Sequence, residues 1–169
     1  RSLEYWILNI GLNFPMKKPP RTPQELVVHT EKMVYGGQAL ARADRFVVFV
    51  DDALPGETVR ARLYKKKKNF AFGRAVEVLA AAPERVPSEC ALTGDCGGCS
   101  FRHCAYPAQL RFKKEVLVES LHGIPGAQDL VRDVVPADPI NDYRNKMVFS
   151  FGTTLDGELV LGLHRRGSF

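Results

Sequence analysis

Short apolar runs separated by turn residues fill the chain from Glu25 to about Ala80. The runs are rich in valine, leucine, alanine and aromatic residues and are too short for helices. We expect strands at residues 26–28, 39–42, 46–50, 58–64 and 75–79, and turns at residues 36–37, 43–45, 54–56 and 69–73. Five such strands are too short for a sandwich of usual size. They predict a small OB-like five-stranded β-barrel, closed or nearly closed, because closure removes exposed strand edges.

The pattern changes after this barrel. Residues 81–89 contain two prolines, which predicts a stiff linker into a cysteine-rich loop. Residues 106–122 predict a helix with Leu110, Leu117 and Leu121 on one stripe. Residues 146–151 and 158–163 predict two strands joined by a hairpin turn at 153–157. The expected fold class is β-rich α+β, with the barrel over 25–82 and the cysteine segment, helix and hairpin over 83–169.

The two ends of the chain do not follow these patterns. Residues 1–24 show no packing pattern and are interpreted as a disordered leader, with Met16 as the expected native start. The apolar run at residues 5–14 is shorter than the roughly 20 residues a membrane-spanning helix needs, and no signal-peptide cleavage pattern follows it. The last apolar run stops without a terminating element, so we expect a truncated chain.

The composition is that of a globular protein, with 45% hydrophobic and 25% charged residues and a mean hydropathy of −0.16. This composition excludes a disordered tail, a collagen-like repeat and a polytopic membrane protein. We expect a monomeric, cytoplasmic protein. Lys and Arg number 24 against 19 acids, a net charge of +5. This modest excess fits a nucleic-acid partner without requiring one.

All four cysteines lie within residues 90–104, and this clustering favours a metal or cluster site over a disulfide scaffold. In the sequence Cys90-x5-Cys96-x2-Cys99, intervening glycines let the loop wrap a single centre. Because this stretch is polar and rich in glycine, it is a poor core for packed thiols. Spacing alone leaves open a zinc site, with Cys104 or His103 as fourth ligand, and an iron–sulfur cluster with a more distant fourth cysteine.

A run of four lysines lies between two predicted strands and is interleaved with aromatic residues. A charge run by itself is typical of a solvated loop. OB-type surfaces, however, bind single-stranded nucleic acid through cations that contact phosphates and rings that stack on bases. A further basic turn at residues 143–146 is a pattern that is usually structural. The candidate RNA-binding residues are Lys65, Lys66, Lys67, Lys68, Phe70, Phe72, Arg144 and Lys146.

The sequence offers no catalytic apparatus. It has no GxGxxG or phosphate-binding loop and no repeated βα units of a cofactor-binding sheet. Its four histidines lie far apart, with no acidic partner at recognisable spacing. We therefore expect neither catalytic nor cofactor-binding residues in this chain.

Taken together, these segments resemble the S-adenosylmethionine-dependent RNA uracil-5-methyltransferases over roughly residues 25–166. The sequences VYGG at residues 34–37 and LPGE at 54–57 look like the TRAM domain, an OB-like RNA-binding barrel. The sequence PERV at residues 83–86, followed by the three cysteines, resembles the family's iron–sulfur segment. The sequence YRNK at residues 143–146 matches its central-domain signature. The most similar branch is the RumA type, which methylates 23S ribosomal RNA.

The resemblance implies a [4Fe–4S] cluster on Cys90, Cys96 and Cys99. The family's fourth ligand is a cysteine that follows an element matching residues 162–164, so it is expected beyond Phe169. Cys104 stands where the family usually has an aliphatic residue. It is therefore interpreted as a packing substitution or a makeshift ligand.

The resemblance also places S-adenosylmethionine, a nucleophilic cysteine and a proton-abstracting glutamate in a methyltransferase domain C-terminal to this region. The implied reaction is thiolate attack on uracil C6, methyl transfer to C5 and removal of the C5 proton. The chain alone is expected to be inactive, and its implied partner is RNA, specifically 23S ribosomal RNA. The alternative is a stand-alone TRAM-type RNA-binding protein with a zinc or cluster module and no enzymatic activity.

Overall fold

The computed structural model describes residues 24–43, 46–154, 156–163 and 166. The chain divides into two compact units, one holding residues 23–93 and 99–138, the other residues 94–98 and 139–169. The predicted leader, apart from Gln24, lies outside the described residues, as does the predicted turn residue pair 44–45.

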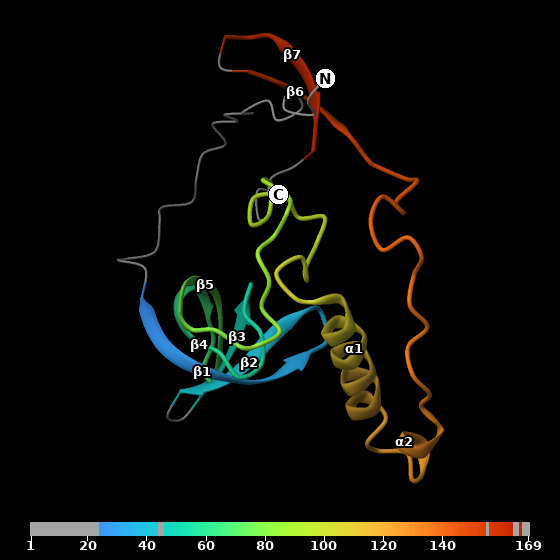
Figure 1. The fold of residues 1–169 in the computed structure, drawn as a ribbon. Helices are drawn as coiled ribbons and strands as arrows, with labels where there is room; N and C mark the ends of the chain where they lie inside the picture. The colour runs from blue at the N-terminus through green and yellow to red at the C-terminus, as the bar shows by residue number, and fades with distance from the viewer. Residues whose placement is uncertain (1–23, 44–45, 155, 164–165, 167–169) are drawn as a thin grey trace. The chain divides into compact units, whose positions relative to one another are not determined.

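The first unit is built on a closed barrel of five strands, which confirms the predicted OB-like fold (Figure 1). The strands are β1 (Glu25–Val34), β2 (Gln38–Ala43), β3 (Phe46–Asp51), β4 (Thr58–Lys66) and β5 (Phe70–Ala80). They close in the order β1-β2-β3-β5-β4, with β4 pairing back to β1. Only β3 and β5 run parallel; the other neighbours are antiparallel.

Strand alternation produces the barrel core. Along β3, Val48 and Val50 point inward while Phe49 between them stays partly exposed, as the period of two requires. Small and β-branched residues fill the interior. The buried members are Val28, Ala39, Ala41, Val48, Val50, Ala53, Val59, Ala61, Leu63 and Ala71.

The prediction for residues 69–73 was wrong. These residues do not form a turn, because β5 begins at Phe70 and pairs with β3 through Val47↔Phe70 to Asp51↔Arg74. The reversal is confined to residues 67–69, where the Lys67 N–H donates to the Phe70 carbonyl at 2.8 Å. Asparagine and glycine at 69 and 73 resemble a turn in sequence, but closing the barrel requires the intervening residues as strand.

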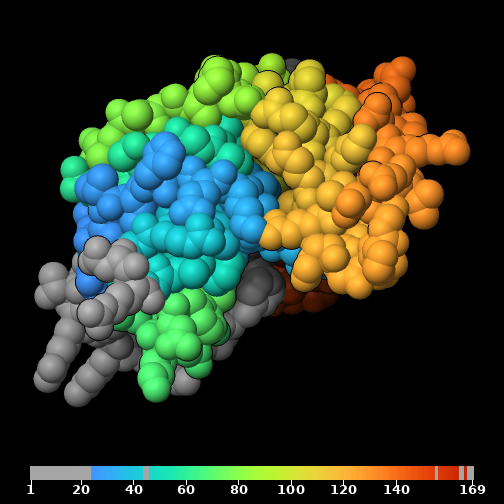
Figure 2. All heavy atoms as spheres, turned by 90° about the horizontal axis from the view of Figure 1, so that it is seen from below, coloured from blue at the N-terminus to red at the C-terminus, as the bar shows by residue number. Residues whose placement is uncertain are grey.

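A helix, α1 (Tyr106–Ser120), lies against β1 (Figures 1 and 2). It covers a second hydrophobic core. The predicted stripe Leu110–Leu117–Leu121 is not its buried face, and Leu117 is about half exposed. The buried positions are instead Ala108 and Phe112, followed by the partly buried Val116, at a spacing of four. The second core comprises Met33, Leu54, Ala82, Cys104, Ala108 and Phe112.

A short helix α2 (Ala127–Leu130) follows α1, and the second unit carries the antiparallel pair β6 (Ser150–Thr153) and β7 (Leu159–Gly162). This confirms the predicted hairpin, but its first strand begins later than expected, because residues 146–149 are irregular and exposed. No helix in the described part of the chain is long and apolar enough to span a membrane.

Candidate RNA-binding face and cysteine segment

The lysine run forms the tip of the β4–β5 hairpin. Lys65 and Lys66 end β4, Lys67 and Lys68 form the reversal, and all four side chains are exposed. Among the described residues, none of the four lies within ion-pair distance of an acidic side chain. Their charge is therefore available to an anionic partner such as a phosphate backbone.

A ladder of aromatic rings crosses three strands beside this tip. From β4 to β3, Tyr64 stacks with Phe72 at 6.3 Å between ring centroids and 24°, and Phe72 stacks with Phe49 at 5.3 Å and 26°. Phe70 meets Phe49 and Phe72 edge-on, at 6.1 and 5.5 Å. We call the four residues Phe49, Phe70, Phe72 and Tyr64 the ring ladder.

Two of the lysines lie over aromatic faces at the same place. Lys65 Nζ is 5.6 Å from the centroid of the Phe72 ring, and Lys66 Nζ is 5.4 Å from that of Phe46. Such cation–π contacts hold a charge next to an apolar surface. The structure thus brings the predicted residues Phe70 and Phe72 together with the lysine run on one part of the barrel.

Sequence reasoning missed Phe49 as a ladder member. It lies on β3, far from the lysines in the chain, and the register Phe49↔Phe72 is what brings it to the ladder. The available signal was the alternation in β3, which leaves Phe49 on the face opposite Val48 and Val50.

The remaining candidates, Arg144 and Lys146, lie in the second unit, in an irregular and exposed segment before β6. Arg144 Nη2 lies 3.5 Å from the carbonyl oxygen of Gly98 in the cysteine segment. The contact of Arg144 and Lys146 with RNA stays a prediction.

Both ends of the cysteine loop are joined at its base. The Val86 N–H donates to the His103 carbonyl at 3.0 Å, and the Ala105 N–H donates to the Glu84 carbonyl at 2.9 Å. An isolated antiparallel bridge between Arg85 and Cys104 lies between these bonds. Residues 87–102 are thus a loop that is closed by its own flanks.

A buried ion pair ties this base to the barrel. Arg85 Nε and Nη2 donate to the two carboxylate oxygens of Glu57 at 2.5 and 2.8 Å, and Nη2 also donates to the Asp52 carbonyl at 2.9 Å. Glu57 is fully buried and accepts further bonds from the N–H groups of Leu54 and Ala82. Burial by itself raises the pKa of Glu57, but the bonds from Arg85 and Leu54 outweigh it, and the net pKa is below the ordinary value.

The four cysteines are all free thiols, and they differ in environment. Cys99 is exposed and Cys90 and Cys96 are partly exposed, whereas Cys104 is buried in the second core. Burial raises the pKa of Cys104 to about 11, which disfavours the thiolate that metal binding requires. Cys104 thus lies in the second core, and its interpretation as a packing substitution stays a prediction.

The other three thiols are at least partly exposed, and the surroundings of Cys96 fit a thiolate-bound centre. Cys96 Sγ accepts the Gly98 N–H at 3.4 Å, a type of bond that tunes ligated sulfur. A Cβ on Gly98 would stand 3.3 Å from that sulfur, so this glycine keeps space beside it. In the same segment, His103 is buried, and its Nε2 has no hydrogen-bond partner among the described residues. Burial lowers the pKa of His103 and favours the neutral ring.

The three thiols are divided between the two units. No group of three or more His, Cys, Asp or Glu residues that could hold a metal ion is present in the part of the chain that the structure describes. Cys96 belongs to the second unit, and Cys90 and Cys99 belong to the first. The metal assignment of Cys90, Cys96 and Cys99 therefore stays a prediction.

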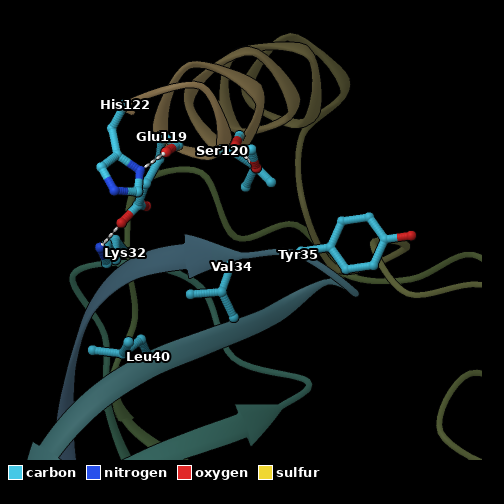
Figure 3. A pocket seen from close by; sticks show the side chains of 8 residues that line it. Lys32, Val34, Tyr35, Leu40, Glu119, Ser120 and His122 are labelled. Atoms are coloured by element: carbon cyan, nitrogen blue, oxygen red, sulfur yellow. Dashed lines mark hydrogen bonds and ion pairs between the residues drawn. The ribbon is translucent and has the colours of Figure 1, made fainter. Parts of the chain in front are cut away.

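An open depression of about 200 Å³ lies between β1 and α1 (Figure 3). Lys32 of β1 forms an ion pair with Glu119 of α1 across it, and His122 Nδ1 is 2.7 Å from the Glu119 carbonyl. Its other lining residues include apolar Val34, Leu40 and Val116. We interpret this depression as the seam at which the helix meets the barrel.

Comparison with known proteins identifies the barrel. The TRAM domain family model matches residues 21–76, which contain β1 to β4 and the first half of β5. The closed five-stranded barrel with its basic hairpin is thus a TRAM domain.

The longer matches are to proteins named as RNA methyltransferases. One from Thermotoga maritima is 40% identical over 142 residues, which is 83% of this chain and 31% of that protein. Others are from Halalkalibacterium halodurans, 33% identical over 83% of this chain and 31% of that protein, and Clostridium acetobutylicum, 36% identical over 78% and 29%. Over most of its length the chain is thus similar to proteins named RNA methyltransferases, and its residues 21–76 match the TRAM domain. It spans about a third of the length of these relatives.

Two solved structures are also similar in part. A conserved protein of Methanococcus maripaludis is 36% identical and covers 38% of this chain and 96% of its own, with a TM-score of 0.31. The Pyrococcus abyssi tRNA (uracil-54, C5)-methyltransferase, in complex with S-adenosyl-L-homocysteine, is 22% identical and covers 57% of this chain and 21% of its own, with a TM-score of 0.38. At these scores neither superposition bears on the function.

Proposed function

We propose that this chain is the RNA-binding and [4Fe–4S]-bearing part of an S-adenosylmethionine-dependent RNA uracil-5-methyltransferase that acts on 23S ribosomal RNA in the cytoplasm. The observation that carries the proposal is the hairpin tip of four exposed lysines beside the ring ladder on a TRAM barrel. Here positive charge that can contact phosphates lies next to ring faces that can stack on bases. Proteins bind single-stranded nucleic acid through this combination. A target base must leave its stack for chemistry, and a front end that grips RNA holds it for that step.

The RNA-binding part of the proposal is tested by the salt dependence of affinity. Binding of the monomeric chain to a labelled single-stranded ribosomal RNA segment is measured by fluorescence anisotropy between 50 and 200 mM KCl. Each phosphate contact contributes about −0.7 to the slope of log K against log salt for single strands. Replacing Lys65, Lys66, Lys67 and Lys68 by glutamine should flatten the slope by up to about 3.

The control changes two lysines elsewhere, the exposed Lys113 and the partly exposed Lys114, which is paired with Asp133. Lys113→Gln with Lys114→Gln, on α1, removes positive charge away from the hairpin tip and should leave most of the slope intact. If the hairpin variant keeps the wild-type slope, the lysine run is only a solvated loop and the proposed RNA contact is wrong.

For the cluster, we assign Cys90, Cys96 and Cys99 as ligands. When bound, a [4Fe–4S] centre supplies a covalent cross-link between turns of the loop at residues 87–102. Protein purified without oxygen should contain iron and sulfide, and Cys99→Ser should lower both. Cys104→Ala is the control and should keep them, because that thiol is buried in the second core. Stoichiometric zinc without iron would contradict the assignment.

For catalysis, we assign none of the four cysteines as the nucleophile that attacks uracil C6. Residues 1–169 incubated with labelled S-adenosylmethionine and ribosomal RNA should bind the RNA but transfer no methyl group. Methylation of C5 by this chain alone would show that one of its own cysteines acts as the nucleophile.

A further inference from the structure

A buried carboxylate holds the exposed end of the ring ladder. Asp51 ends β3, and only 7% of its surface is exposed. Its Oδ2 accepts a hydrogen bond from the Tyr64 hydroxyl at 3.0 Å, and its Oδ1 accepts one from Gln38 Nε2 at 2.9 Å. Burying a charge is costly unless it is hydrogen-bonded, and here two side chains of the surface donate hydrogen bonds to it. Tyr64, about half exposed, is thereby fixed in one orientation.

The same carboxylate fixes the Gln38 amide. An ionised carboxylate only accepts hydrogen bonds, so the amide nitrogen and not the oxygen must face Asp51. That nitrogen also lies 3.4 Å from the Tyr64 hydroxyl. Gln38 is partly exposed, and its amide oxygen Oε1 is left as an acceptor to which no described residue donates a hydrogen bond.

The exposed Tyr64 ring is held rigid beside the oriented Gln38 amide oxygen. This arrangement is suited to a planar ligand that carries an N–H donor on its edge. An RNA base presents both a π face and N–H donors on its Watson–Crick edge. A base in a duplex hides its face in the stack, so only an unpaired base can use this arrangement. The neighbouring Lys65, over the Phe72 ring, lies where charge would meet the phosphate of such a strand.

We propose that Gln38, Asp51 and Tyr64 form a nucleobase-binding site for single-stranded RNA. The base stacks on Tyr64 as a continuation of the ring ladder, and an N–H on its edge donates to Gln38 Oε1. Asp51 is a positioning residue that acts through the other two. The inference rests on the proposed RNA-binding function and adds a base contact to its phosphate contacts.

If a base stacks on Tyr64, removing that ring should lower the RNA affinity without changing its salt dependence. Loss of one base–aromatic stack costs about 1–3 kcal/mol, or roughly 5- to 150-fold in affinity. Tyr64→Ala should therefore weaken binding of a labelled 12-nucleotide oligouridylate within that range, with the wild-type slope against salt. Lys65→Gln should instead flatten the slope by about 0.7, because it removes a phosphate contact. Tyr35→Ala, a highly exposed tyrosine in the β1–β2 turn, is the matched control and should change neither.

The edge contact is tested by changing both partners. Wild type should bind oligouridylate more tightly than the same oligomer built from 3-methyluridine, whose N3–H is blocked. Gln38→Met removes the acceptor at similar size and should reduce this preference. Tyr64→Phe, which keeps the ring and loses its hydroxyl, should weaken binding less than Tyr64→Ala. It serves as the second variant if the alanine variant does not fold.

The outcomes separate the two proposals. If wild type binds no RNA, the proposed function fails and this inference fails with it. If wild type binds with the expected salt slope but Tyr64→Ala binds equally well, only the inference is overturned. An equal response of wild type and Gln38→Met to 3-methyluridine overturns the edge contact in the same way.

Discussion

At the scale of single residues, this protein buries charge at two strand ends, and both buried carboxylates hold something in place. Asp51 holds Tyr64 and Gln38 at the ring ladder. Glu57 holds Arg85 and, through it, the base of the cysteine loop. Removing the Glu57 carboxylate leaves the Arg85 charge uncompensated. Removing the Asp51 carboxylate takes away the acceptor that orients Tyr64 and Gln38, so both carboxylates should be sensitive positions.

Replacing Glu57 by glutamine should destabilise the protein by about 3 kcal/mol at pH 7. The folded pKa of Glu57 is below its ordinary value of 4.5, so its contribution is complete above pH 4.5 and is lost as pH falls through the folded pKa. The difference in free energy of unfolding between wild type and variant should therefore narrow in acid. Urea unfolding at pH 7 and at pH 3–5 measures it.

The control is Glu77→Gln, which breaks the exposed Arg60–Glu77 pair on the same barrel and should change stability little. If Glu57→Gln has the same free energy of unfolding as wild type at pH 7, the contact with Arg85 does not stabilise the protein.

The thiols should separate by reactivity in metal-free protein. With a pKa of about 11, Cys104 has almost no thiolate near neutral pH, and it is buried as well. A thiol reagent at pH 7.5 should therefore label three cysteines quickly and the fourth only on unfolding. Cys104→Ala should retain the three fast thiols; four equal rates in wild type would contradict its place in the core.

At the scale of elements, the alternation of buried and exposed residues made the strands of the barrel predictable. The strand pairing that closes the barrel could not be predicted in the same way. The runs at residues 46–50 and 58–64 become β3 and β4 with small extensions. The first half of β5 was mistaken for a turn because Asn69 and Gly73 are turn formers. Only the pairing of β5 with β3, a contact between segments distant in sequence, shows that Gly73 belongs to a strand.

The buried face of the helix and the residues of the site were also difficult to predict from local sequence. Leucines at residues 110, 117 and 121 suggested the buried face of α1, but the second core accepts Ala108 and Phe112 instead. The lysine run could be predicted because like charges are consecutive in the chain. Gln38, Asp51 and Glu57 carry no periodic signal, since a polar residue at a strand end resembles a solvated one until its partners from other strands are known.

Gly73 should not accept a side chain. A Cβ there would lie 3.1 Å from the backbone oxygen of Arg62 and 3.0 Å from Leu63 Cδ2. The backbone cannot yield as a side chain can, so Gly73→Ala should cost about 1–3 kcal/mol. Thermal unfolding should show a midpoint lower by roughly 2–4 °C for each kcal/mol. Gly123→Ala, where a Cβ meets open space, is the control. Equal unfolding midpoints for the two variants would show that the β4 backbone does not lie within contact distance of a Cβ at residue 73.

At the scale of the whole molecule, both hydrophobic cores belong to the first unit. The barrel core lies within the five strands, and the second core joins Met33 and Leu54 to Ala108 and Phe112 of α1. The second unit has exposed apolar residues on its strand pair, such as Phe151 and Leu159, and contributes to neither core. Stability should therefore reside in residues 24–138.

A chain ending at Asp138 should keep the barrel fold, because it retains both cores and the Glu57–Arg85 pair. We expect its thermal midpoint within a few degrees of the full chain and an RNA affinity that retains the lysine-dependent salt slope. A chain ending at Ala105 is the matched comparison. It loses Ala108 and Phe112 and should melt well below both, since losing one large core side chain costs about 3–5 kcal/mol. Unfolding of the chain that ends at Asp138 would mean that residues 139–169 carry part of the stability, and the barrel and α1 could not then be treated as a self-sufficient RNA-binding unit.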